Sequence, residues 1–213
     1  MRSIDLDTWP RRVHFETFRQ FDYPHFNITS TIDVEHMLPI IRGHRASLTI
    51  AITYLLTRTA NQLENFRWRI RGDEVIEHEI VHPSITVLTS DDLFSFCTME
   101  YVPEFSKFAD GAAETIAHAR EHPTLEDKTS QDDLLFMTSI PWVPFTSFIH
   151  PMHLNPVDSI PRLAWGKIHV IEGRQKMPLS VQGHHALMDG LHVGRYFENM
   201  QINCDNSGAL LKT

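Results

Sequence analysis

The chain has 213 residues, and its 19 Lys and Arg against 27 Asp and Glu leave a formal net charge of −8. Hydrophobic residues make up 42% and charged residues 22%, proportions that fit a globular protein and exclude a disordered tail, a collagen-like fibre and a coiled coil. The acidic balance argues against nucleic acid as the main partner, because binding to phosphate backbones depends on clustered Lys and Arg. The 14 histidines make a metal site or acid–base chemistry worth testing.

The length predicts one domain over residues 1–213, since single cores grow to roughly 250 residues. Near the N-terminus, acidic residues stand where a signal peptide needs an apolar stretch. The longest apolar segment, residues 48–56, is much shorter than the roughly 20 residues of a membrane-spanning helix. Cys97 and Cys204 lie far apart without CxxC spacing. A reduced, cytoplasmic protein with no membrane partner is therefore the simplest interpretation.

The helices are predicted from capping residues and apolar spacing. The first is expected to begin at Asp7 or Thr8, with Pro10 in its first turn, where a missing N–H costs nothing. Asp33 is expected to cap a short second helix, which Pro39 disturbs. Apolar residues at helical spacing predict further helices at residues 47–62, 104–121 and 191–203, the first of these buried nearly all round.

The strands are predicted from alternating or β-branched runs, with residues 124–133 as a polar loop. Gly72-Asp73 and Glu172-Gly173 are expected to form hairpin turns. Helices and strands are interspersed without strict alternation, which predicts an α+β protein with a mixed sheet covered by helices. The predicted strands are residues 26–32, 66–71, 74–79, 84–89, 94–101, 134–140, 145–149, 163–171 and 177–182.

Residues that carry chemistry concentrate in the segment Gln-Gly-His-His-Ala-Leu-Met-Asp-Gly-Leu-His at 182–192. A zinc interpretation takes His185, Asp189 and His192, at i, i+4 and i+7, as ligands on one face of a helix. It requires a helix through Gly190, which costs about 1 kcal/mol relative to Ala. A purely structural interpretation makes Asp189 the N-cap of the last helix, with the histidines as satisfied polar residues.

A catalytic interpretation of the same segment places an imidazole at the end of a strand. A histidine there can act as general base on a hydroxyl or thiol, because an imidazole is mostly neutral at pH 7. Asp189 need not touch the ring. Paired with an arginine, it can hold the turn rigid, so capping and catalysis are compatible roles.

At these residues the chain resembles the chloramphenicol acetyltransferase family in its trimeric, acetyl-CoA-dependent form. Similar segments are Trp-Pro-Arg-Arg-Val-His-Phe-Glu-Thr-Phe at 9–18, Val-His-Pro-Ser-Ile-Thr-Val at 81–87, Pro-Trp-Val-Pro-Phe-Thr-Ser-Phe at 141–148 and Met-Pro-Leu-Ser-Val-Gln at 177–182. The resemblance covers nearly the whole chain in one order. The HxxxDG pattern alone is shared with dihydrolipoyl acyltransferases and other CoA-dependent acyltransferases.

The resemblance implies roles for individual residues. His185 would be the general base, with its tautomer held by a hydrogen bond to its own carbonyl. Asp189 would form a buried ion pair with Arg11, joining the last helix to the first. Ser147 would donate a hydrogen bond to the tetrahedral oxyanion.

The substrates and the assembly are implied in the same way. Phe18 and Phe26 would line the acceptor pocket, although both also suit a plain aromatic core, and Lys167 would contact CoA. The implied reaction is acetyl transfer from acetyl-CoA, as co-substrate, to a hydroxyl of chloramphenicol, which inactivates the antibiotic. No tightly bound cofactor or metal is implied. The implied fold is a two-layer α/β sandwich that associates as a homotrimer, with His185 facing a pocket formed largely by the neighbouring chain.

Several positions depart from the family pattern, and they leave a different hydroxyl or thiol acceptor open as a second interpretation. The catalytic set is retained despite these changes. The departures are Pro144, Ala164, Ile168, Gly183 and Leu191.

Overall fold

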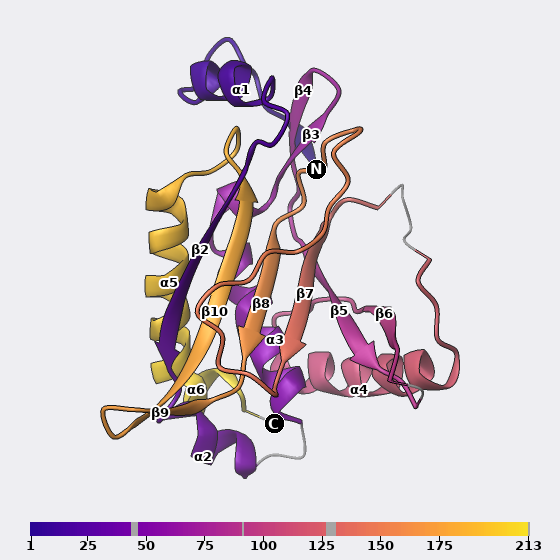
Figure 1. The fold of residues 1–213 in the computed structure, drawn as a ribbon, viewed down its shortest axis with the longest axis vertical. Helices are drawn as coiled ribbons and strands as arrows, with labels where there is room; N and C mark the ends of the chain where they lie inside the picture. Colours follow the sequence, from indigo (N-terminus) through magenta and orange to yellow (C-terminus); the bar gives the residue numbers. More distant parts are fainter. Residues whose placement is uncertain (44–46, 91, 127–130, 213) are drawn as a thin grey trace.

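The computed structural model describes residues 1–43, 47–90, 92–126 and 131–212. Within these residues, a seven-stranded sheet forms the centre of the molecule (Figure 1). A three-stranded sheet lies beside it, in the order β1 (Arg2–Ser3), β4 (Glu74–Glu77) and β3 (Trp68–Arg71). The large sheet has the order β2 (His25–Asp33), β10 (Arg174–His184), β8 (Arg162–Gly166), β7 (Leu134–Ile140), β5 (His82–Leu88) and β6 (Phe94–Thr98), with β9 (His169–Ile171) paired to β10.

The large sheet is mixed, as the sequence predicts. Strand β10 is antiparallel to both β2 and β8, whereas β7 is parallel to both β8 and β5. Parallel neighbours need a crossover connection, and helix α4 supplies one between β5 and β7 through β6. The helices are α1 (Arg12–Phe18), α2 (Met37–Arg42), α3 (Leu48–Asn61), α4 (Phe105–Glu121), α5 (Gly190–Asp205) and α6 (Ser207–Leu210), with a 3₁₀ turn at Glu64–Phe66.

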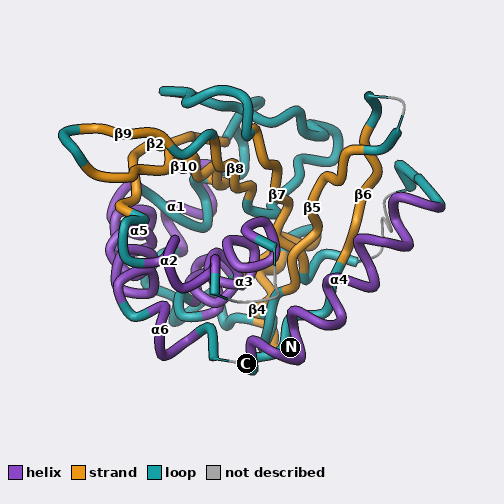
Figure 2. The backbone as a smooth tube through the Cα atoms, turned by 90° about the horizontal axis from the view of Figure 1, so that it is seen from below, coloured by secondary structure: helices purple, strands orange, loops and turns teal. Residues whose placement is uncertain are grey.

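Helices α3, α4 and α5 lie on one side of the large sheet, and loops cross its other side (Figure 2). Leu179 and Val181 of β10 belong to the core that includes Tyr54 of α3 and Tyr196 of α5. Because strand side chains alternate, Ser180 and its outward neighbours face the opposite side. The result is the two-layer sandwich that the resemblance implies.

The segment 141–161, which we name the strap, crosses this second face. Its residues 145–149 were expected to form a strand, and that prediction is wrong, since they are irregular. Pro144 and Pro151 on either side lack an N–H for a ladder. The main chain between them bonds instead to side chains of β10, for example through Ser180 Oγ to the carbonyl of Phe148 at 3.0 Å.

Other predicted elements are displaced or divided. Helix α1 begins at Arg12 and not at Asp7 or Thr8, because the preceding residues form turns. The expected long strand 163–171 is interrupted at Lys167 and Ile168, between β8 and β9. The hairpin turn at Glu172 and Gly173 is confirmed, with φ of 52° and 79°.

The short helix α2 differs from the prediction in its start. Asp33 does not cap it, because the Asp33 carboxylate accepts the N–H of Glu35 and His36 holds the cap position. Pro39 stands in the first turn of α2, where it removes no helical hydrogen bond. Part of the predicted loop 124–133, residues 127–130, lies outside the described residues.

Cys97 and Cys204 are free and buried, and burial raises their pKa values to about 11 and about 12. These thiols are therefore inert core residues at neutral pH. In the part of the chain that the structure describes, no helix has the length and apolar character needed to cross a membrane.

Candidate active site

The turn between β10 and α5 carries the histidine motif. Strand β10 ends at His184, and α5 begins at Gly190 with Asp189 as its N-cap. The Asp189 carboxylate accepts the N–H of Leu191 at 3.1 Å, and His192 Nδ1 accepts the N–H of Asp189 at 3.1 Å. This reciprocal capping box satisfies helix N–H groups that would otherwise lack partners. The N-cap prediction is confirmed, and we name residues 185–189 the His185 turn.

Arg11 holds the His185 turn from the N-terminal side, just before α1. Its Nη1 donates to Asp189 Oδ2 at 2.9 Å, its Nη2 to the carbonyl of His185 at 2.8 Å, and its Nε to the carbonyl of Ala186 at 3.0 Å. The side chains of Arg11 and Asp189 are 10% and 31% exposed, so the pair is largely shielded from water. Burial alone would raise the pKa of the Asp189 carboxyl, but the hydrogen bond and charge of Arg11, together with His192 and the Leu191 N–H, outweigh it and the pKa is lowered. Arg11 thus makes the turn one rigid unit with the first helix.

The imidazole of His185 is packed between two aromatic rings. Phe18 of α1 stacks on it, with centroids 4.0 Å apart and planes 7° apart, and Phe26 of β2 lies at 4.9 Å. The main-chain N–H of His185 donates to the carbonyl of Pro24 at 2.8 Å. Among the described residues, the buried Nδ1 has no hydrogen-bond partner. The bond that was expected from the other ring nitrogen to the carbonyl of His185 is therefore absent among the described residues, and Arg11 donates to that carbonyl instead.

Two further histidines, His184 and His25, lie at the end of β10 next to His185. His184 is 2% exposed, its Nδ1 accepts the N–H of Ala186 at 3.2 Å, and burial lowers its pKa to about 3. Its ring meets His25 of β2 edge to face at 5.1 Å. His25 Nε2 lies 2.6 Å from the carbonyl of Asp158, and burial lowers the pKa of His25 as well. Both rings are therefore neutral at pH 7 and serve as polar packing beside His185.

The residues of the zinc interpretation have other partners. His192 Nδ1 accepts a main-chain N–H, and burial lowers the pKa of His192, so this ring is neutral. The 2.9 Å approach of Asp189 Oδ1 to the same nitrogen is therefore not an ion pair. Across residues 1–43, 47–90, 92–126 and 131–212, no group of three His, Cys, Asp or Glu side chains is placed to hold a metal ion.

The predicted residues Ser147 and Lys167 lie away from this turn. Ser147 is exposed in the strap, and the next carbonyl, that of Phe148, is bound by Ser180 Oγ. Ser180 precedes His185 by five residues of extended chain, a separation of roughly 16 Å. Lys167 is exposed beyond β8, and its N–H donates to Val143 of the strap at 3.1 Å.

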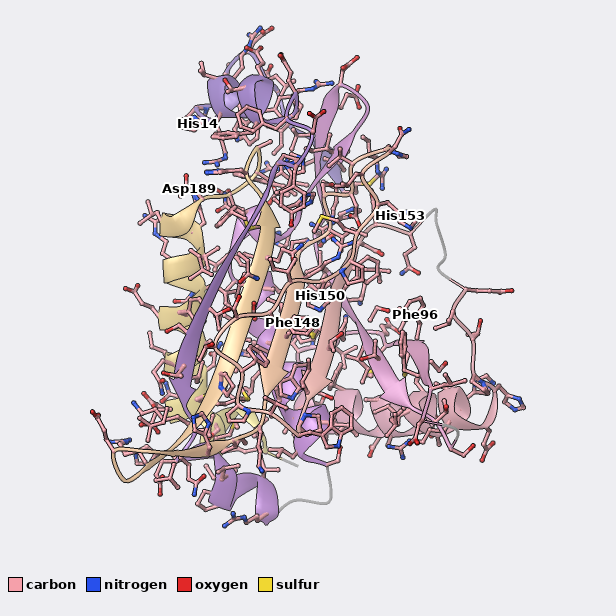
Figure 3. The ribbon with its side chains drawn as sticks, viewed as in Figure 1. His14, Phe96, Phe148, His150, His153 and Asp189 are labelled. Atoms are coloured by element: carbon pink, nitrogen blue, oxygen red, sulfur yellow. The ribbon has the colours of Figure 1, made fainter. Side chains whose placement is uncertain are left out.

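The predicted site residues thus fall into two groups within one chain. Figure 3 shows Asp189 at the start of α5, with Phe148 and His150 of the strap over the middle of the sheet. Arg11, Phe18, Phe26, His185 and Asp189 form one group, and Ser147 and Lys167 belong to the other.

The polar row that separates these groups was not predicted from the sequence. Ser180, Gln182 and His184 alternate with apolar residues along β10, and all three are buried. The alternation of these residues with apolar ones could have predicted a polar face of the strand. It could not have predicted that this face contacts the strap, whose residues are distant in the sequence. The same holds for Asp158 and Arg162, which form a buried ion pair beside His25.

The mixed sheet has helices on one face, and a histidine turn follows strand β10. This arrangement defines the CoA-dependent acyltransferase fold. A solved chloramphenicol acetyltransferase matches with a TM-score of 0.84 at 24% identity, covering 94% of this chain and 98% of that one. The dihydrolipoamide acetyltransferase of Azotobacter vinelandii matches with a TM-score of 0.71 at 17% identity, covering 94% and 88%.

The sequence narrows this class to one family. The family described as chloramphenicol acetyltransferase matches residues 1–201. A chloramphenicol acetyltransferase of Klebsiella sp is 29% identical over 206 residues, which cover 95% of this chain and 93% of the relative. The chain belongs to the chloramphenicol acetyltransferase family and is an acyltransferase.

Proposed function

We propose that the protein transfers the acetyl group of acetyl-CoA to a hydroxyl of chloramphenicol in a ternary complex. His185 takes the proton of the hydroxyl as its oxygen attacks the thioester carbonyl. The C–S bond then breaks, and the proton passes to the CoA sulfur. Acetyl-CoA acts as a co-substrate, and no tightly bound cofactor takes part. The observation that carries the proposal is the His185 turn, rigidly bound by Arg11, in a chain of this family.

The packing around His185 supports its role as general base. Phe18 and Phe26 hold the ring on two sides, so its orientation is set before substrate arrives. The same rings form an aromatic wall suited to the nitrophenyl group of the acceptor. A general base that is already oriented contributes about 10²–10⁴ to the rate.

We infer further that the active protein is a homotrimer with its sites between chains. Ser147 lies too far along β10 to serve the His185 of its own chain. A neighbouring chain would bring its strap to that histidine, so that the Ser147 hydroxyl stabilises the oxyanion. Lys167, at the end of β8, would place a cation near the CoA phosphates, which the net charge of −8 otherwise repels. A cytoplasmic location completes the proposal.

The direct test is the release of CoA thiol on mixing purified protein with acetyl-CoA and chloramphenicol. We expect release that depends on the acceptor, and a folded protein without it would overturn the substrate assignment. Reassorting His185→Ala chains with Ser147→Ala chains tests the shared site. Random trimers should regain about one quarter of the sites, because each site takes its two residues from different chains. A mixture no more active than its parents would place both residues in one chain.

One observation favours a second acceptor for the same reaction. Leu191, close to the His185 turn, is 61% exposed and departs from the family pattern, as do Pro144 and Ala164. Changed side chains around a pocket alter which acceptor fits it. The thiol-release assay should therefore include a panel of small hydroxyl and thiol compounds. A higher kcat/KM for one of these than for chloramphenicol would replace the acceptor and retain the mechanism.

A further inference from the structure

Strand β10 carries a polar row on the face that the strap covers. Ser180 and Gln182 are each 1% exposed and His184 is 2% exposed, although none of them lies in the apolar core. A buried polar side chain without a hydrogen bond costs free energy. The partners of this row therefore show what it is built to hold.

Ser180 binds the strap through its hydroxyl. Asn27 Nδ2 donates to Ser180 Oγ at 2.7 Å, and the hydroxyl faces two acceptors, the carbonyl of Phe148 at 3.0 Å and Asn27 Oδ1 at 3.1 Å. Asn27 lies on β2, and its Oδ1 accepts a hydrogen bond from Thr29 Oγ1 at 3.2 Å. The hydroxyl is thus oriented from behind by the neighbouring strand.

Gln182 binds the strap two residues further on. Its Oε1 accepts the N–H of His150 at 2.9 Å, and its Nε2 lies 3.7 Å from Met152 Sδ. The bonds from Ser180 and Gln182 therefore hold the main chain at Phe148 and at His150, immediately after Ser147. We name these two bonds the strap clamp.

The strap clamp holds a stretch of main chain that has no hydrogen bonds of a β-ladder. Residues 145–149 belong to no strand, so neighbouring strands do not hold their main chain. Pro151 closes the segment without an N–H to donate. The place of the Ser147 main chain consequently depends on two side chains of β10.

We propose that Ser180 and Gln182 are positioning residues that set the Ser147 hydroxyl for oxyanion stabilisation. The inference rests on the proposed function, in which Ser147 touches the reacting atoms. An oxyanion donor works only within about 2.7–3.1 Å of the developing charge. A shift of about 1 Å can cost 10²-fold in rate. The His185 turn has its own support from Arg11, so loss of the clamp leaves the general base in place.

Kinetics of Gln182→Ala test the proposal. We expect kcat to fall by about 10–10²-fold with KM for both substrates nearly unchanged, because the clamp acts on the transition state. The double variant Ser147→Ala with Gln182→Ala should lose no more than Ser147→Ala alone. Effects that multiply would show that Gln182 acts independently of Ser147 and would overturn the proposal.

A matched control is available in Gln201 of α5. Its side chain also pairs with main-chain groups of a neighbouring segment, accepting the Asp33 N–H at 2.9 Å and donating to the Asp33 carbonyl at 3.0 Å. Gln201→Ala should keep kcat while losing similar hydrogen bonds. If Gln182→Ala fails to fold, Ser180→Ala tests the other half of the clamp. Its control is Ser95→Ala, which loses a buried hydroxyl bond to the Thr124 carbonyl at 3.1 Å.

Hydrogen exchange separates this inference from the proposed function. In Gln182→Ala we expect the His150 amide to exchange at least about tenfold faster, since it has lost its acceptor. The His185 amide, bonded to the Pro24 carbonyl at 2.8 Å, should be unaffected. An unchanged His150 amide would overturn the clamp, whatever the substrate. Absence of CoA release by the unaltered protein would overturn the proposed function alone.

Discussion

The His185 turn and the strap carry the two halves of the proposed chemistry, yet they are held in different ways. The turn joins a regular strand to a regular helix, and a capping box and Arg11 bind its main chain. The strap has no regular structure around Ser147 and is held by side chains that reach out from β10. The comparison teaches that a local motif can build its own support, whereas an irregular segment must take support from elsewhere.

The two regions should therefore respond differently to substitution. A change in the turn affects both folding and rate, because the same bonds hold α1, β10 and α5 together. A change at the exposed Ser147 should affect rate alone. The four predictions below test this contrast.

The largest effect is expected for His185→Ala. Loss of the general base should reduce kcat/KM by about 10²–10⁴, measured as CoA thiol release. His14→Ala, on the exposed face of α1, serves as the control and should be silent. Retained activity in His185→Ala would remove the turn from the chemistry.

Ser147→Ala comes next and concerns the strap. Removing one oxyanion donor should lower kcat by about 10²–10³. The melting temperature should not change, because the side chain is exposed and makes no hydrogen bond to another described residue. Thr146→Ala, also exposed and one residue away, is the matched control. A loss of stability without a loss of rate would reverse the contrast between the two regions.

Arg11→Ala tests the support of the turn. Without Arg11, the Asp189 carboxylate and two main-chain carbonyls lose their hydrogen-bond donor. The free energy of unfolding should fall by about 3 kcal/mol, because one charge of a shielded pair is left without its partner. Arg12→Ala removes exposed pairs with Asp7 and Glu16, which water screens, and should lower the free energy of unfolding far less. Urea unfolding measures both variants. Equal stabilities would show that Arg11 does not hold the turn.

The smallest effect is expected from acid, and it involves His184, which precedes the His185 turn, and His150 of the strap. Burial lowers the pKa of His184 to about 3, and burial with the nearby Arg162 lowers that of His150 to about 4, from 6.5. Between those values the unfolded chain binds protons that the folded chain does not, so stability falls as pH drops. The melting temperature should be level above pH 7 and decline progressively below about 6.5.

A variant assigns part of this decline to the strap. His150→Phe removes one such group and should flatten the dependence of melting temperature on pH, while His14→Phe, at an exposed position, should not. An unchanged slope for His150→Phe would mean that His150 is already protonated in the folded protein at these pH values.

Much of the fold was readable because local patterns and tertiary contacts agree. Ser47 caps α3 with its hydroxyl 3.3 Å from the Ile50 N–H, and the apolar spacing of that helix matches its burial. Strand β7 occupies its predicted bounds. The start of α1 was predicted too early because Asp7 and Thr8 resemble a helix cap. In the structure the residue before the helix is Arg11, which bonds to the Ala186 carbonyl, 175 residues away in the sequence.

The candidate site likewise has a part that could be predicted from local sequence and a part that could not. His185, Asp189 and Gly190 were recognisable because a strand end, a cap and a helix start are neighbours in the sequence. Residues 145–149 are mostly aromatic and β-branched, which favours a strand, and the prediction failed because pairing depends on neighbouring strands and on the prolines at both sides. Nothing local indicates that the carbonyl of Phe148 would bond to Ser180.

The sequence by itself determined the class of protein, the histidine that we propose as general base and the cap that follows it, because these depend on residues close together in the chain. Only the tertiary structure decided that Arg11 grips the turn by three hydrogen bonds and that Phe18 stacks on His185. It also decided that Ser147 and His185 of one chain stand apart. The physical reason is that hydrogen bonds and ring contacts form wherever the folded chain brings partners together, whatever their separation in the sequence.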